Sequence, residues 1–372
     1  MNIGILGAGQ LGQMLALAGY PLGLRFRFFD PRRDAIAGRL GEHVCAEFSD
    51  RQGLAEFSAG LDVATFEFEN VPATVAYALH REVPVYPQPR VLDVLQDRLT
   101  EKGLLRRLGL RTAAFAPATT AEELQQAFAA VGSPAILKSR RAGFDGRGQA
   151  RCRTATDAIE SWRQLGQPPV ILEAVVPFAR ELSLVSVRGR DGEIRHYPLV
   201  ENHHVGGILH STRAPAARCA DLQQNAEAQS VALMEALKYV GVIAIEFFEC
   251  DGELVVNEVA PRVHNSGHWT IEGADTSQFE NHLRAILGWP LGSTAARGWS
   301  VMMNVIGTPP APGRTADILR LPNTHLHLYG KTPYPHRKIG HVTTRMTEET
   351  QLPDRLSTLA GILGSQAEGT FR

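Results

Sequence analysis

The segment 241–260 constrains the fold more than any other part of the chain. GVIAIEFFEC and ELVVNEVA are two apolar, strand-like runs joined by an Asp-Gly dipeptide, which favours a two-residue β-turn. We therefore predict a β-hairpin with Glu246 on one strand and Glu258 on the other. A type I′ turn alone would place Asn257 opposite Glu246, whereas a three-residue loop or one bulge would place Glu258 there.

The chemistry of the two glutamates depends on that register. Facing carboxylates, followed closely by arginine, asparagine and two histidines in the segment 262–268, are suited to a hard divalent cation beside a phosphate. Acids on paired strands are more often solvated side chains. Here the flanking residues are Val, Ile, Ala and Phe, so one face is buried, and a buried carboxylate is costly without a cation. We predict Mg²⁺, with Mn²⁺ as a substitute, at Glu246 and Glu258.

Length and composition indicate a globular enzyme of two or three domains. The chain has 372 residues, and its 38 Lys and Arg nearly balance its 39 Asp and Glu, which disfavours nucleic acid and anionic membranes as partners. The four cysteines have no CxxC spacing, so we expect neither a zinc site nor a disulfide framework. The sequence shows neither a signal peptide nor an apolar run of membrane length, and we expect a cytoplasmic protein.

Strand-like and helix-like segments alternate in the first hundred residues. This alternation predicts a parallel, doubly wound sheet, with ligands at the carboxyl ends of its strands. The segment Gly7–Gly12 also matches the dinucleotide fingerprint GxGxxG, with Asp30 where a ribose-binding acid would lie. An NAD-dependent dehydrogenase is therefore an alternative hypothesis, although any glycine turn that binds a phosphate has the same pattern.

The middle of the chain carries a nucleotide-binding pattern. Lys138 lies near the end of a predicted strand, and the following loop, Gly143–Gln149, has three glycines within six residues. Such a loop can fold its amides over phosphates, and the lysine can reach the same oxygens. A glycine-rich surface turn between solvated arginines is the alternative interpretation. Further along, the run Ile171–Val176 suits adenine, and Glu181 suits the ribose hydroxyls.

The last eighty residues predict a small β-rich domain closed by a helix. SVMMNVIG, HLHLYGK and RKIGHVTTR alternate like strands, and QLPDRLSTLAGILG has helical spacing. Lys331, Arg337, Lys338 and Arg345 are basic residues in this region. They suit a ribose 5′-phosphate, and a solvated basic face is the alternative.

The order of these parts resembles the ATP-grasp superfamily. Within it, the chain is similar to the N5-carboxyaminoimidazole ribonucleotide synthase family, the biotin-independent carboxylases of purine synthesis. The matching motifs are GAGQLGQM, EFENVP, DRLTEK, AGFDGRGQ, NEVAPRVHNSGHW and HRKIGHV, which span nearly the whole chain. The resemblance implies an α/β fold in three domains: a Rossmann-like parallel sheet (1–97), an ATP-grasp domain of α+β type (98–290) with a mobile lid (about 112–177), and a C-terminal β-rich domain (291–372).

The resemblance also implies a role for each matching position. Positions that would bind ATP are Arg98, Lys138, Gly143, Phe144, Asp145, Gly146, Arg147, Gly148, Gln149, Glu173, Ala174, Val175, Val176, Glu181, His204, Asn257 and Glu258. Positions that would bind 5-aminoimidazole ribonucleotide are Gln10, Leu11, Glu67, Asn265, Lys331, Lys338 and Arg345. Asp145, Arg147, Arg262 and His264 would surround the reacting carboxyl group. Many relatives carry Tyr where this chain has Phe144, and Glu69 has the same spacing as Glu67, which leaves the choice between those two acids open.

The expected reaction is phosphorylation of bicarbonate by ATP, followed by carboxylation of the ribonucleotide amine, with Asp145 or His264 as the base. We expect a homodimer whose product passes to a mutase. The nearest alternatives are a formate-using transformylase and an amine–carboxylate ligase of the same superfamily. An ATP-grasp module without activity is disfavoured because both acids and Lys138 are present.

Overall fold

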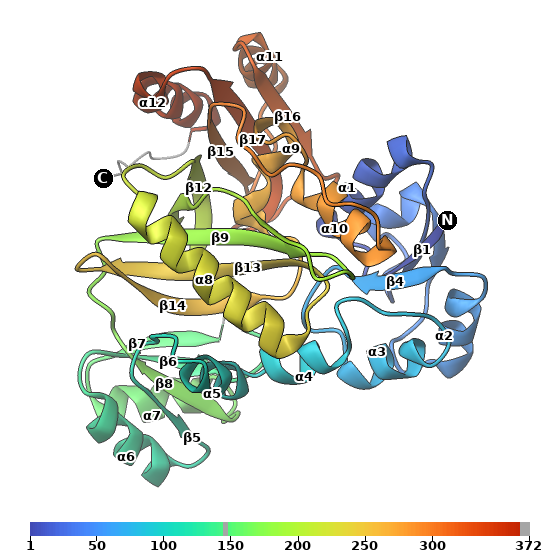
Figure 1. Cartoon of the computed structure of the whole chain (residues 1–372). Helices are drawn as coiled ribbons and strands as arrows, with labels where there is room; N and C mark the ends of the chain where they lie inside the picture. The colour runs from blue at the N-terminus through green and yellow to red at the C-terminus, as the bar shows by residue number, and fades with distance from the viewer. Residues whose placement is uncertain (144–147, 365–372) are drawn as a thin grey trace.

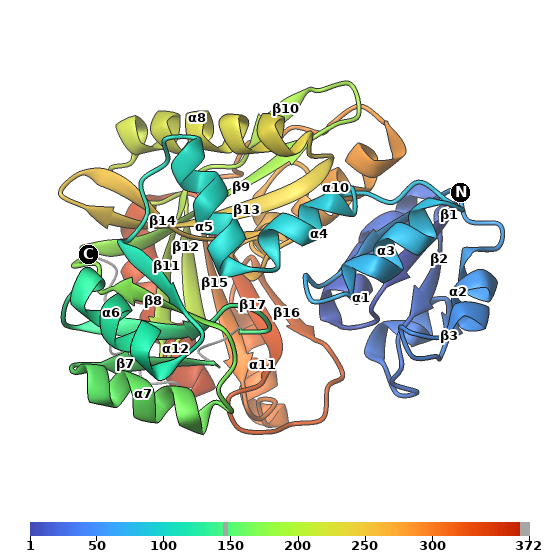
Figure 2. The same cartoon turned by 90° about the horizontal axis from the view of Figure 1, so that it is seen from below.

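The computed structural model describes residues 1–143 and 148–364, which form three β-sheets with helices packed around them (Figure 1). A parallel N-terminal sheet lies at one end of the molecule and a small antiparallel sheet lies at the other. A nine-stranded antiparallel sheet lies between them, as the view from below also shows (Figure 2).

The N-terminal sheet has the order β3-β2-β1-β4, and all its strand pairs are parallel. Its strands are β1 (Asn2–Leu6), β2 (Arg25–Phe29), β3 (Glu42–Val44) and β4 (Val63–Phe66), and the helices of this part are α1 (Gln10–Gly19), α2 (Arg51–Ser58), α3 (Ala73–His80) and α4 (Arg90–Leu95). The adjacent residues Phe28 and Phe29 are both fully buried, as expected for a sheet that is covered on both faces. The predicted doubly wound domain is confirmed.

The small antiparallel sheet corresponds to the predicted lid segment and has the order β5-β8-β6-β7. Its strands are β5 (Phe115–Ala118), β6 (Ala135–Ser139), β7 (Gln149–Cys152) and β8 (Val170–Ala174), covered by α6 (Ala121–Val131) and α7 (Ala155–Gln164). Leu124 of α6, Leu137 of β6 and Trp162 of α7 lie in one apolar cluster, so this layer has its own core.

The central sheet has the order β14-β13-β9-β11-β12-β15-β17-β16, with β10 beside β9. Its strands are β9 (Arg180–Arg188), β10 (Ile194–His196), β11 (Val200–Val205), β12 (Ile208–Ala214), β13 (Gly241–Cys250), β14 (Glu253–Ala260), β15 (Trp299–Ile306), β16 (Thr324–Leu328) and β17 (Lys338–Met346). The C-terminal strands predicted from the sequence are present. β15 pairs with β12, so the C-terminal strands extend the central sheet. The central sheet therefore includes strands from both sides of the domain boundary predicted at residue 290.

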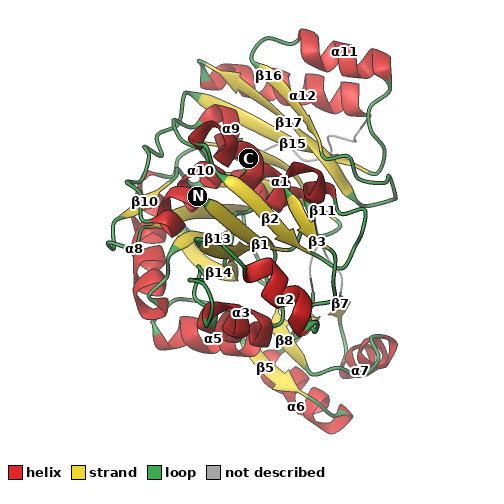
Figure 3. Ribbon diagram, turned by 90° about the vertical axis from the view of Figure 1, so that its right-hand side faces the viewer, coloured by secondary structure: helices red, strands yellow, loops and turns green. Residues whose placement is uncertain are grey.

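The remaining helices pack on the central sheet, and α10 also contacts the N-terminal layer. They are α5 (Arg98–Arg107), α8 (Ala220–Leu237), α9 (Thr270–Gly273), α10 (Gln278–Leu287), α11 (Pro312–Arg320) and α12 (Leu352–Leu363). α8 crosses one face of the sheet (Figure 1), α10 packs on both β13 and α1, and α5 packs on β14. In the view of Figure 3, α11 and α12 lie at the top and α6 and α7 at the bottom. None of the helices in the described ranges is both long and apolar enough to cross a membrane.

Candidate active site

The predicted hairpin is formed by β13 and β14, and it contains a bulge. Asp251 and Gly252 have φ angles of 52° and 77°, as a two-residue turn of type I′ requires. Beyond the turn the register shifts, and Glu246 pairs with Glu258, which leaves Asn257 as the extra residue. Of the two registers that the sequence allows, the one with facing glutamates is therefore correct. Directly opposed residues place their side chains on the same face of a hairpin.

Two side chains of α5 satisfy the backbone groups at this bulge. Lys102 Nζ donates to the carbonyl oxygen of Asn257 at 3.1 Å, and Glu101 Oε1 accepts from the backbone N–H of Val259 at 2.6 Å. Lys102 is fully buried. Because an unpaired buried backbone group is costly, these contacts make the bulge, and with it the facing register, a fixed feature.

Three cations surround the acids of the hairpin and of β8. Arg98 Nη1 lies 2.9 Å from Glu258 Oε2, and Lys138 Nζ lies 3.0 Å from Glu173 Oε2. The second oxygen of Glu173 lies 3.4 Å from Lys102 Nζ. Burial opposes ionisation of Glu173, but the charges of Lys138 and Lys102 outweigh it and lower its pKa to about 2.

The two facing acids have different ionisation behaviour. Burial and the charge of Glu258 raise the pKa of Glu246 to about 7. Burial also disfavours the charged form of Glu258, but Arg98 and Lys138 bring its pKa below the ordinary value. A partly buried carboxylate pair with incomplete charge compensation fits a hard divalent cation. The described residues contain no group of three or more His, Cys, Asp or Glu suited to a metal ion, so phosphates and water would have to supply the remaining ligands.

Arg262 and His264, two residues predicted to be catalytic, lie beside these acids. His264 Nε2 is 3.5 Å from Glu246 Oε1, and Arg262 forms an ion pair with Glu69. Burial, followed by the charge of Arg262, holds the pKa of His264 well below its ordinary value, so the imidazole is neutral. Glu69 thus lies at the predicted reaction centre, held by the same arginine that would bind bicarbonate.

Glu67 has a different environment from Glu69. Its carboxylate accepts hydrogen bonds from the backbone N–H groups of Gly9 and Gly12, the latter at 2.7 Å. An added Cβ would lie 2.6 Å from Glu67 Cγ at Gly7 and 2.6 Å from Glu67 Oε1 at Gly9. The glycines of the GxGxxG pattern are therefore needed to enclose a carboxylate of the protein itself, and the pattern no longer argues for NAD.

The predicted adenine segment is partly used by the protein itself. The backbone N–H of Ala174 donates to the carbonyl of Ala114 at 2.8 Å, and that of Val175 donates to Pro134 at 3.2 Å. These two amides are therefore already used in hydrogen bonds within the protein and cannot also donate to adenine. Nearby, Glu181 Oε2 lies 3.0 Å from His204 Nδ1, which joins β9 to β11 at two predicted ATP-binding positions.

The C-terminal basic residues predicted to bind the ribose phosphate separate into two places. Lys331 Nζ donates to the carbonyl oxygen of Lys338 at 3.2 Å, and the charge of Lys338 acts on both Glu246 and His264. Arg345 lies seven residues further along β17, a distance of about 23 Å at the usual rise of a strand. It is too far from Lys338 to bind the same phosphate, so the structure does not bring these predicted ligands together.

The other predicted ribonucleotide-binding positions differ in their surroundings. Asn265 exchanges two amide hydrogen bonds with Asn304 of β15, at 3.0 and 2.7 Å. Gln10 is the first residue of α1, and Leu11 is 7% exposed and belongs to the apolar core. Four of the loop positions predicted to bind ATP or to act in catalysis lie outside the described residues; these are Phe144, Asp145, Gly146 and Arg147.

Sequence reasoning assigned no role to Glu101 and Lys102, although both lie in the quoted motif DRLTEK. A signal was present, since Arg98, Glu101, Lys102 and Leu105 have the i, i+3, i+4, i+7 spacing of one helix face. Leu105 is fully buried, which puts the charged members of this set against the hairpin.

This arrangement defines the protein class. A lysine on a lid strand, paired acids on an antiparallel hairpin and a preceding parallel sheet are the parts of an ATP-grasp ligase. Residues 103–279 match the ATP-grasp domain, residues 1–96 match the ribonucleotide synthetase preATP-grasp domain, and residues 300–355 match the phosphoribosylaminoimidazole carboxylase C-terminal domain.

Similar proteins narrow the class to one family. The chain is 48% identical to the N5-carboxyaminoimidazole ribonucleotide synthase of Pseudomonas aeruginosa, over 98% of this chain and 99% of the relative. It is 52% identical to the solved Thermus thermophilus synthetase, with a TM-score of 0.93 and coverage of 99% and 100%. The synthase of Aspergillus clavatus, solved with ADP and 5-aminoimidazole ribonucleotide, is 30% identical with a TM-score of 0.89, and 98% of each chain is covered.

The chain belongs to the N5-carboxyaminoimidazole ribonucleotide synthase family. It is an ATP-dependent ligase of purine biosynthesis, as the resemblance implied, and its predicted fold class is confirmed.

Proposed function

We propose that the enzyme carboxylates the amine of 5-aminoimidazole ribonucleotide in two steps at the site around Glu246. A bicarbonate oxygen attacks the γ-phosphorus of ATP and the bond to ADP breaks, giving carboxyphosphate. The C–O bond of carboxyphosphate then breaks to give CO₂ and phosphate, and the amine nitrogen bonds to the carbon as it loses a proton. The observation that carries this proposal is the facing pair Glu246 and Glu258 between Lys138, Arg98 and His264.

Glu246 and Glu258 would hold Mg²⁺, or Mn²⁺ in its place. The fit rests on the facing register and on the pKa of Glu246, which is raised to about 7 by burial and by Glu258. Bound there, the ion would offset charge on the β- and γ-phosphates.

Lys138 and Arg98 would bind the phosphates by exchanging partners. Lys138 pairs with Glu173, which keeps Lys102 as a second partner, and Arg98 pairs with Glu258, which would keep the metal ion. A phosphate oxygen forms the same type of charge-assisted hydrogen bond to such a cation as a carboxylate does, so it can replace a shared carboxylate. ATP binding therefore redistributes these ion pairs and needs no new charged residue.

Arg262 would hold bicarbonate and then the carboxyl group of carboxyphosphate. Its guanidinium is buried and already bound to a carboxylate, Glu69, so an anion of similar shape can take its remaining donors. Lys331 and Lys338 would bind the ribose phosphate, which places the amine on the side of the site that Lys338 shares with His264.

An ADP-release assay tests the proposal. We expect release to require ATP, 5-aminoimidazole ribonucleotide and bicarbonate, and the ribonucleotide to gain one carbon from labelled bicarbonate. Formate in place of bicarbonate should give no product. Release driven by formate, or by an amino acid, would instead support another ATP-grasp ligase. A homodimer, transfer of the product to a mutase and a cytoplasmic location remain predictions.

A further inference from the structure

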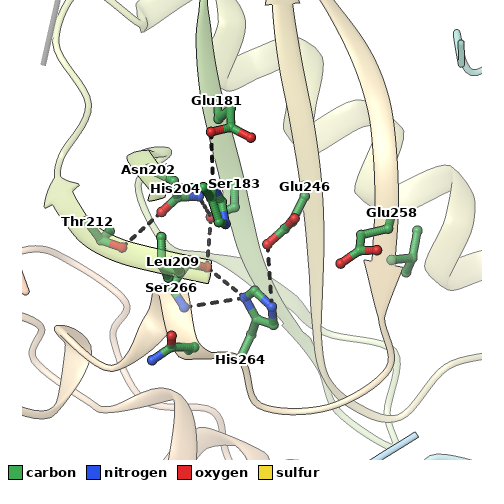
Figure 4. Close-up of polar contacts among 12 residues, drawn as sticks. Glu181, Ser183, Asn202, His204, Leu209, Thr212, Glu246, Glu258, His264 and Ser266 are labelled. Atoms are coloured by element: carbon green, nitrogen blue, oxygen red, sulfur yellow. Dashed lines mark hydrogen bonds and ion pairs between the residues drawn. The ribbon is translucent and has the colours of Figure 1, made fainter. Parts of the chain in front are cut away.

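A chain of hydrogen bonds runs through the central sheet and ends at His264 (Figure 4). Thr212 Oγ1 contacts Asn202 Oδ1 at 2.9 Å, and Asn202 Nδ2 contacts Ser183 Oγ at 2.9 Å. Ser183 Oγ lies 2.8 Å from Ser266 Oγ, which lies 2.9 Å from His264 Nδ1. Thr212, Asn202, Ser183 and Ser266 are at most 6% exposed, so water does not replace these contacts.

The direction of the hydrogen bonds is fixed at the His264 end. The backbone N–H of Ser266 also donates to His264 Nδ1, at 3.4 Å, so the His264 ring caps the short 3₁₀ turn 265–267. A backbone N–H can only donate, so Nδ1 must accept. The Ser266 hydroxyl then donates to Nδ1 as well and accepts from Ser183, which in turn accepts from the Asn202 amide. In this direction every donor in the chain has an acceptor, and the backbone N–H of Ser266 selects it over the reverse direction.

We infer that the chain Thr212–Asn202–Ser183–Ser266 holds His264 as the tautomer with its proton on Nε2, so that His264 offers the reaction centre a hydrogen-bond donor and not a base. Nε2 is the nitrogen that faces Glu246, at 3.5 Å. The inference rests on the proposed function, because the oxygen that accepts this hydrogen bond would belong to bicarbonate or carboxyphosphate.

The consequence is a division of roles at the site. A nitrogen that already carries a proton cannot take one from the amine, so His264 is removed as the base and Asp145 remains of the two residues predicted from the sequence. Ser266, Ser183 and Asn202 are positioning residues. They touch no substrate and act by orienting the ring and fixing its proton.

A similar cluster of side chains on the opposite face of β9 provides a matched control. Ser186 and Ser183 are three residues apart on this strand, and their side chains therefore point to opposite faces. Ser186 Oγ contacts His196 Nδ1 at 2.8 Å and Ser230 Oγ at 2.9 Å, which repeats the pattern of two serines and one imidazole away from the proposed site. Replacing Ser230 by Ala removes the same type of buried contact without touching the chain that ends at His264.

Nitrogen NMR of the whole enzyme labelled with ¹⁵N-histidine tests the tautomer directly. The His264 signals, assigned by their loss in His264→Gln, should show a protonated Nε2 and an unprotonated Nδ1. Ser266→Ala removes one of the two donors to Nδ1, so it should shift the Nδ1 signal while the proton stays on Nε2, and Ser230→Ala should leave both signals unchanged. A wild-type enzyme with the proton on Nδ1 would overturn the inference whatever the activity of the variants.

The two amide replacements of His264 test the role. The amide of Gln reaches the position of Nε2 and can donate there, whereas that of Asn lies near Nδ1; neither amide can act as a base. We expect His264→Gln to keep most of kcat and His264→Asn to lose about 10²–10³-fold, the usual cost of a missing transition-state donor. Equal loss in both, with ATP still bound, would point to a base and contradict the inference. Bicarbonate-dependent ADP release by the wild type reports separately on the proposed function.

Discussion

Two groups of carboxylates in this enzyme, one buried and one partly buried, differ in what compensates their charge. In the N-terminal sheet, Glu67 accepts two backbone amides, and Asp30 accepts the backbone N–H of Ala8 and two guanidinium bonds from Arg32. In the hairpin, Glu246 and Glu258 face each other, and side-chain groups such as Arg98, Lys138 and Lys338 offset their charge.

The difference separates structural acids from ligand-binding acids. Backbone amides cannot leave their partner without unfolding the loop, so Glu67 is a permanent part of the glycine turn. In the proposed mechanism, side-chain cations such as Arg98 and Lys138 would rotate to a phosphate and leave the carboxylates to a metal ion. Partial burial together with side-chain cations that can move is what favours the hairpin as the proposed site.

Neutralising an acid of the hairpin should have the largest effect. We expect Glu246→Gln and Glu258→Gln each to lower bicarbonate-dependent ADP release by at least about 10²-fold, because one ligand of the ion that offsets phosphate charge is lost. Titration with Mg²⁺ should show a weaker apparent affinity. Glu253→Gln, at the exposed tip of the same hairpin, should behave like the wild type. Retained Mg²⁺ affinity in both variants would remove these acids from the metal site.

Substitutions of the two lysines that contact Glu173 should have different effects, one on stability and the other on ATP binding. Lys102 is fully buried and fixed to the bulge, so Lys102→Met should lower the free energy of unfolding by about 3 kcal/mol. Lys138→Met should cost less stability and abolish ATP binding, since Lys138 is the partner that can move to phosphate. Urea unfolding and calorimetric titration with ATP measure the two quantities. Loss of ATP binding in Lys102→Met alone would reverse this assignment.

The N-terminal acid Glu67 should affect stability rather than nucleotide use. In Glu67→Gln, the new NH₂ group faces an amide donor in the glycine turn, and we expect a loss of about 1–3 kcal/mol in thermal unfolding experiments. The KM for ATP should stay unchanged. A stable variant with a selective rise in the KM for 5-aminoimidazole ribonucleotide would instead support the prediction from sequence that Glu67 binds substrate.

This comparison also shows what the sequence could predict. The hairpin, its turn and its acids follow from apolar runs and an Asp-Gly dipeptide, which are local signals. The register could not be chosen locally, because the groups that fix the bulge are Glu101 and Lys102, more than 150 residues away. The GxGxxG pattern suggested NAD binding for the same reason, because the carboxylate that it encloses belongs to Glu67, 55 residues from Gly12.

The relative positions of the C-terminal basic residues were also not predictable from the sequence. Motif order placed Lys331, Lys338 and Arg345 together, but strand geometry separates Arg345 from the other two. The polar chain behind His264 was not predictable at all, because it joins residues of four separate segments that only the central sheet brings into line.

The smallest effect we predict is a pH dependence of stability from Asp30. Burial raises the pKa of this carboxyl, but the hydrogen bonds and charge of Arg32 and the Ala8 amide outweigh it and hold the pKa below the ordinary value. Asp30 therefore stabilises the fold above its unfolded-state pKa, near 4, and this stabilisation is lost as pH falls through the lowered native pKa. In urea unfolding we expect Asp30→Asn to cost about 1 kcal/mol at pH 7 and progressively less below pH 4. Asp34→Asn, at an exposed neighbour, should cost nothing at either pH. A deficit in Asp30→Asn that is independent of pH would mean that shape, and not the charge of the carboxylate, holds this turn.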